Sequence, residues 1–165
     1  MRRLWVFLLV LLLPAVACKQ DQNGPADAPE QEVIADTLPL PRAVAISAGA
    51  RSEMPDWSEF NALEKRMDAI YQVEGPEDMT LLLDDLLELC GQLEGSEFPE
   101  TFDQASVRSR IKVFKTFLMK TRGALDYRQD YRPALRQSLE AYNALREQLD
   151  RIVTSIIDPS IFKDE

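Results

Sequence analysis

The chain contains no histidine among its 165 residues. This absence excludes a Ser-His-Asp triad, a Cys-His pair and most zinc sites, because each of these needs an imidazole. No glycine-rich phosphate loop is present either, and the densest carboxylates, Asp84, Asp85 and Glu88, are explained as a solvated acidic surface of a helix. We therefore expect a protein that is not an enzyme, with no catalytic residue, no cofactor and no metal ligand.

Apolar runs long enough to span a bilayer are also lacking, since the longest, residues 4–13, has ten residues and a transmembrane helix needs about 20. Arg2 and Arg3 precede this run, and Pro14 with a small-residue triplet leads from it to Cys18. A charged start, a short apolar stretch and small residues are typical of a cleavable export signal. The alternatives are an ordinary secretory signal that happens to contain a cysteine, and an uncleaved N-terminal anchor.

This layout resembles a bacterial lipoprotein precursor whose lipobox ends at Cys18. The resemblance implies that residues 1–17 are a signal peptide, and that Cys18 becomes the mature N-terminus with a diacylglycerol on its thiol. Two or three acyl chains, such as palmitate, then anchor the protein to the cell envelope at about 0.8 kcal/mol per buried methylene. Lys19 replaces the aspartate that marks inner-membrane retention in enterobacterial lipoproteins, which implies the outer membrane, facing the periplasm or the surface.

Cysteine is scarce, because Cys90 is the only one besides Cys18. Once Cys18 is lipidated, no intramolecular disulfide can form. Cys90 lies in an apolar helical stripe between Leu86 and Leu93, which predicts a buried structural thiol. The alternatives, a mixed disulfide or a reactive group, lack the nearby positive charge that a low-pKa thiolate needs.

Regular periodicity is missing between Cys18 and about Pro55, where proline, alanine, glutamine and acidic residues predominate. This composition predicts a lipidated cysteine followed by a disordered tether over residues 18–55. The short apolar patches at 33–34 and 43–46 could dock on the domain or on a partner, but the composition favours a solvated linker.

Residues 56–157 contain four stretches with apolar residues three and four apart. The stretches run over about 56–71, 76–95, 107–125 and 133–157, with Gly75-Pro76, Gly95 and Pro133 at their limits. No segment alternates like a strand. The pattern predicts an all-α fold, an antiparallel four-helix bundle, followed by a tail at 158–165. Three helices with a frayed fourth are the main competitor.

The helix order, with a longer second connection and a long final helix, is similar to the four-helix bundle of the cytochrome c-prime and soluble b-type cytochrome class. Haem in that class is held by a histidine on the last helix, often with a methionine from the first. Met67 is available, but this chain has no histidine and no Cys-x-x-Cys-His. The resemblance therefore implies the bundle without haem ligands.

Charge is unevenly distributed along the chain. Residues 53–103 contain fifteen carboxylates and two cations, whereas residues 104–151 contain eleven cations and five carboxylates. Complementary charge between neighbouring helices explains this pattern. The functional alternative is a basic face of the third helix that meets an acidic partner or lipid headgroups. The candidate residues of this face are Arg108, Lys112, Lys115, Lys120 and Arg122. A nucleic-acid partner is not expected, because the chain is acidic and exported.

Two functions remain open from the sequence. The first is a tethered structural or interaction module that binds another envelope protein, through Tyr127 and Tyr131 or through the basic third helix. The second is a carrier of a small apolar ligand or metal between the helices. Large residues such as Trp57 and Phe114 favour the first, because a carrier needs small residues around its pocket.

Overall fold

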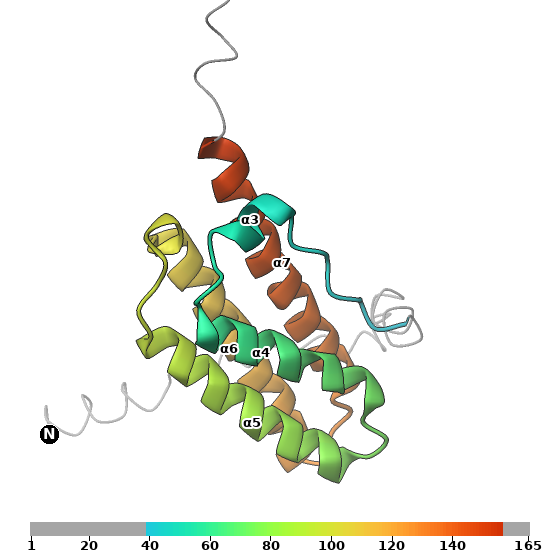
Figure 1. The fold of residues 1–165 in the computed structure, drawn as a ribbon. Helices are drawn as coiled ribbons and strands as arrows, with labels where there is room; N and C mark the ends of the chain where they lie inside the picture. The colour runs from blue at the N-terminus through green and yellow to red at the C-terminus, as the bar shows by residue number, and fades with distance from the viewer. Residues whose placement is uncertain (1–38, 157–165) are drawn as a thin grey trace, which may run out of the picture. The chain divides into compact units, whose positions relative to one another are not determined.

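The fold of residues 39–156 is known from a computed structural model and is all-α, with no strand in this part of the chain (Figure 1). Cys18 and the regions predicted as a signal peptide and a C-terminal tail lie outside the described residues. The described elements are α3 (Ala48–Ser52), α4 (Ser58–Met67), the 3-10 helix η1 (Asp68–Gln72), α5 (Pro76–Gly95), the 3-10 helix η2 (Glu100–Phe102), α6 (Ala105–Asp126) and α7 (Arg132–Ile156).

The helix α5 has the limits that the sequence predicts. Pro76 occupies its first turn, where the missing N–H costs nothing, and Glu77 and Asp78 stabilise its positive N-terminal end. At its C-terminus the backbone N–H of Ser96 donates to the carbonyl of Leu93 at 3.3 Å. The apolar stripe is buried and includes Met79, Leu82, Leu83, Leu86, Cys90 and Leu93.

The two longest helices, α6 and α7, pack against each other, and α6 also packs against α5. The inner residues of α6 follow the predicted spacing of three and four and are all buried: Val107, Ile111, Phe114, Leu118 and Thr121. The buried hydroxyl groups of Thr121 and Ser138 form a hydrogen bond of 2.9 Å between the two helices. Arg128 turns the chain between α6 and α7 with a positive φ of 54°.

The first predicted helix is divided in the structure. α4 ends at Met67, and the chain tightens into η1 before Val73 becomes extended. Figure 1 shows α4 beside α5, and α3 beside α7. Ring stacking holds the start of α4 in the core, because Trp57 lies 5.1 Å from Phe60 and 6.1 Å from Phe102 between ring centroids.

Residues 39–55, which the composition assigns to a disordered tether, belong to the folded domain instead. Ile46, Ala50 and Met54 are buried at intervals of four residues, and Ala50 is completely inaccessible. Gly49 allows the close approach of α3 to α7, since a Cβ atom there would lie 3.3 Å from Val153 Cγ1. The segment 41–54, called the strap below, is therefore a packed element.

No helix in residues 39–156 is both apolar enough and long enough to cross a membrane.

Candidate interaction surfaces

The lipidation site predicted at Cys18 lies outside the described residues, so the structure places only the second predicted feature, the basic face of α6. The five candidate residues do not share one outward face. Lys115 Nζ lies 2.5 Å from Glu94 Oε2 of α5, and Arg122 Nε lies 2.7 Å from Asp84 Oδ1 of the same helix. These two cations therefore bridge α6 to α5, as the complementary-charge interpretation predicts.

Arg108 is also engaged within the domain. Its Nη2 lies 2.7 Å from Asp103 Oδ1, and its guanidinium lies over the Phe98 ring, 3.9 Å from the centroid. Arg122 has a second carboxylate partner, Asp126, one turn further along α6. Because water screens such half-exposed ion pairs, they align the helices more than they hold the fold together.

The remaining two candidates lie on a surface that we call the outer face of α6. It consists of Lys112, Val113, Met119, Lys120 and Tyr127. Val113, Met119 and Tyr127 are 41%, 50% and 79% exposed. Lys120 Nζ donates to Gln137 Oε1 at 2.8 Å, and neither lysine forms an ion pair within residues 39–156.

Of the two tyrosines that the sequence suggests, only Tyr127 is exposed. Tyr131 is partly buried against the core. The outer face thus combines two cations with the exposed side chains of Val113 and Met119 on α6 and of Tyr127 at its C-cap.

A second group of polar side chains holds the strap through its backbone. The N–H of Val44 donates to Asn143 Oδ1 at 3.0 Å, and Asn143 Nδ2 donates to the carbonyl of Arg42 at 2.9 Å. The N–H of Ser47 donates to Asp150 Oδ1 at 2.9 Å. Because the partners are 99 to 103 residues apart in sequence, no local pattern indicates these contacts.

The strap is also fastened by a charged cluster around Glu64. Glu64 accepts hydrogen bonds from Arg51 of α3 and from Arg146 of α7. Arg146 is almost completely buried; its Nε donates to the Val44 carbonyl at 2.5 Å and its Nη1 to Tyr142 Oη at 3.0 Å. Burial opposes ionisation of Glu64, but the two arginines outweigh it and hold the pKa of this carboxyl below its usual value.

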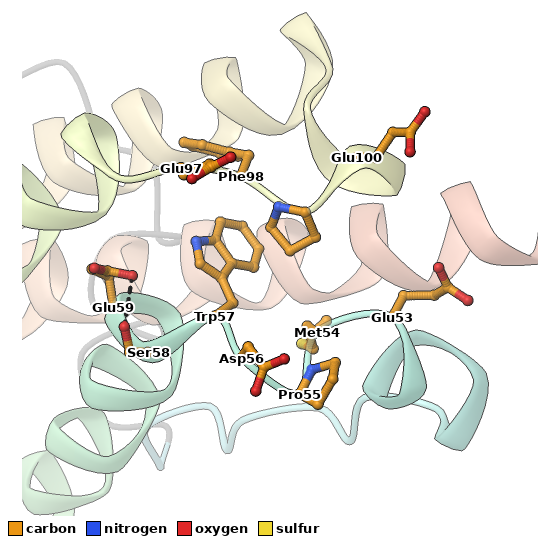
Figure 2. Close-up of a pocket in the computed structure, with 11 residues that line it drawn as sticks. Glu53, Met54, Pro55, Asp56, Trp57, Ser58, Glu59, Glu97, Phe98 and Glu100 are labelled. Carbon is orange, nitrogen blue, oxygen red and sulfur yellow. Dashed lines mark hydrogen bonds between the residues drawn. The ribbon is translucent and has the colours of Figure 1, made fainter.

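An acidic pocket of about 510 Å³ lies between the turn before α4 and the turn after α5 (Figure 2). Five carboxylates line it, from Glu53, Asp56, Glu59, Glu97 and Glu100. Figure 2 shows the indole of Trp57 beside Phe98, and their ring centroids lie 5.0 Å apart. The indole is fixed in place, because Trp57 Nε1 donates to Ser96 Oγ at 3.2 Å.

The sequence did not reveal this pocket, because its two acidic segments are about forty residues apart. Its carboxylates also do not form a metal site. Within the described part of the chain, no three His, Cys, Asp or Glu residues are arranged to hold a metal ion.

Cys90 is free and completely buried, as its place in the apolar stripe predicts. Burial raises the pKa of its thiol to about 12 despite the opposing effect of Lys115. The thiol therefore stays protonated at neutral pH and is a packing group in the folded domain.

Comparison with known proteins finds no matching family model, no matching curated protein and no matching solved structure.

Proposed function

We propose that this chain is a bacterial envelope lipoprotein, anchored to the outer membrane through lipid on Cys18, with a non-enzymatic domain that binds another envelope protein. In this proposal the partner-binding surface is the outer face of α6. We also propose that α4 with η1, α5, α6 and α7 form an antiparallel four-helix bundle, with α3 and the strap added to it.

The outer face of α6 is the observation that carries this proposal. Val113 and Met119 are exposed on a helix whose opposite side is buried, and Tyr127 is exposed at the C-cap of this helix. Exposed apolar groups that gather on one face favour a protein-binding site over a simple solvated surface. Lys112 and Lys120 add positive charge within a strongly acidic chain, so the face suits a partner with an acidic surface.

The carrier function, for a small apolar ligand or a metal, is the alternative and has less support. A carrier needs space between the helices, whereas large side chains fill the core here. The largest fully buried ones include Trp57, Phe60, Phe102, Phe114 and Tyr142. Every buried polar side-chain atom in residues 39–156 already has a hydrogen-bond partner, so none awaits a ligand.

The proposed anchor leaves the domain room to reach a partner. Twenty residues separate Cys18 from Pro39, which corresponds to at most about 70 Å at about 3.5 Å per residue. This reach is shorter than the predicted tether allowed, because residues 39–55 are part of the domain. The partner should therefore be bound to the same membrane or lie close to it.

Crosslinking in intact envelopes tests the proposal. The wild type is compared with Cys18→Ala, which cannot be lipidated, and with a Lys112→Glu/Lys120→Glu double variant. Lys115 is left unchanged, because its reversal would break the ion pair with Glu94 and confuse binding with folding. We expect one envelope protein to be recovered with the wild type and lost with both variants.

A Lys65→Glu/Arg151→Glu double variant is the matched control, since both residues are exposed, lie on other helices and give the same change in net charge. If this control loses the partner as well, the effect is one of overall charge and the outer face is not the binding site. Mass spectrometry of the mature N-terminal peptide tests the anchor separately. An unmodified Cys18, or an intact signal peptide, contradicts it.

A further inference from the structure

The charges of the domain fall into two groups. Ion pairs join the helices to one another, for example Arg66 Nη2 to Asp85 Oδ2 at 2.5 Å between α4 and α5, and Lys115 to Glu94 between α5 and α6. Other charged side chains have no ion-pair partner within residues 39–156, among them those of two surfaces. These are the basic outer face of α6 and the acidic pocket.

The acidic pocket is suited to a cationic side chain. None of its five carboxylates is ion-paired within residues 39–156, and no cation of this part of the chain lines it. Trp57 and Phe98 lie among these carboxylates but are only 2% and 7% exposed, so the attraction comes from the carboxylates. Arg108 already binds at the rim, where its guanidinium contacts both Phe98 and Asp103.

No ion pair joins the two surfaces within one molecule. Arg108 reaches the rim of the pocket from the first turn of α6. At about 1.5 Å per residue, Lys112 lies about 6 Å further along the helix axis and Tyr127 about 28 Å further. The outer face therefore extends away from the pocket, and both surfaces remain open to another molecule.

We infer that the outer face of α6 of one copy of this chain docks on the acidic pocket of a second copy. The inference rests on the proposed function and names a second copy as the partner of the same face. Lys112 and Lys120 supply the charge opposite Glu97 and Glu100, and the apolar side chains between the lysines cover Pro55, which is exposed on the pocket lining.

The contact joins two different surfaces, so it is heterologous, and the pair keeps one free face and one free pocket through which a chain can extend. The area is small, so the contact is weak in dilute solution. Anchoring of both copies to one membrane raises their effective concentration.

The test uses residues 19–165, which keep the whole described domain and remove none of its core. Sedimentation velocity compares the wild type at about 0.01 M and about 1 M salt, where the Debye length falls from about 30 Å to about 3 Å. We expect association at low salt and monomers at high salt. Lys112→Glu/Lys120→Glu, and separately Glu97→Lys/Glu100→Lys, should each weaken self-association at least about tenfold, because like charges then face each other.

Mixing the two charge-reversed variants provides the decisive measurement. Each variant still has one intact surface, so the mixture should form one-to-one complexes although each variant alone stays monomeric. Two control variants make the same changes in net charge at other exposed positions. They are Lys65→Glu/Arg151→Glu and Glu74→Lys/Glu77→Lys, and both should associate like the wild type. Circular dichroism of every variant shows whether the helices are retained.

A monomeric wild type at low salt overturns the inference, and so does a mixture that fails to associate. A control that loses association as strongly as the test variants overturns it too. If the outer face binds anionic vesicles and the protein does not self-associate, the partner is the bilayer and the inference is also overturned. The envelope crosslinking tests the proposed function independently of these results. If it recovers a different protein through the outer face, the proposed function holds and only the second copy is refuted.

Discussion

Replacement of Glu64 by glutamine tests whether one buried charge cluster fastens the strap to the domain. The Arg146 side chain is 7% exposed and the Glu64 side chain 21% exposed, so Glu64→Gln leaves a nearly buried guanidinium without its carboxylate. Breaking a buried pair by removing one partner costs about 3–5 kcal/mol. Since water reaches Glu64 in part, we expect a loss of about 2–3 kcal/mol in the free energy of unfolding.

Arg51→Gln is the matched control, because it removes the other arginine that binds the same carboxylate. The Arg51 side chain is 39% exposed, and Glu64 keeps Arg146 as a partner in this variant. The expected loss is therefore that of an exposed pair, about 0.2–1 kcal/mol.

Urea denaturation of residues 19–165, followed by circular dichroism, measures both variants against the wild type. A third variant, Glu64→Leu/Arg146→Met, removes both charges and should recover part of the stability that Glu64→Gln loses. Equal losses for Glu64→Gln and Arg51→Gln would refute the reasoning. The burial of Arg146 would then not determine the cost.

Three further outcomes follow from the structure. The pKa of Glu64 is lowered in the folded state. Ionised Glu64 therefore stabilises the fold fully above about pH 4.3, the usual pKa of a glutamate in an unfolded chain. This contribution is lost as pH falls through the folded-state pKa. The stability gap between the wild type and Glu64→Gln, measured by urea titration across pH, should thus be constant near neutrality and shrink in acid; a gap that widens in acid contradicts the sign. The Cys90 thiol should resist alkylation in the folded domain at about pH 8 and react at once in urea, because it is buried and its pKa is about 12. Asn143→Ala should cost about 1–2 kcal/mol for two lost backbone hydrogen bonds and remove the hydrogen-exchange protection of the Val44 amide; unchanged protection, or an equal effect of Asn61→Ala on α4, contradicts this role.

The helices that the sequence predicted best are those with strong local signals. Pro76 and Gly95 bound α5 as predicted, and the apolar spacing of α6 and α7 identified their buried sides. These features depend on residues within a few turns of each other. Cys90 was placed correctly for the same reason.

The strap and the division of the first helix were not predicted. The strap contains few apolar residues, chiefly Ile46, Ala50 and Met54, within a polar sequence that contains prolines. The local sequence therefore predicts a linker and not a packed segment. They are buried because α7 offers Asn143, Arg146 and Asp150 as hydrogen-bonding partners for the strap. The basic face was predicted only in part, since which cations face α5 depends on how α5 and α6 are rotated against each other.

The sequence by itself determined the all-α class, the limits of the long helices and the residues that face the core. Periodicity of 3.6 residues and the backbone restrictions of proline are local properties, and they act before any tertiary contact forms. The tertiary structure alone decided which charges are paired, where the strap lies and that an acidic pocket forms around Trp57. Each of these depends on contacts between segments about forty to one hundred residues apart, and only the packed helices bring those segments together.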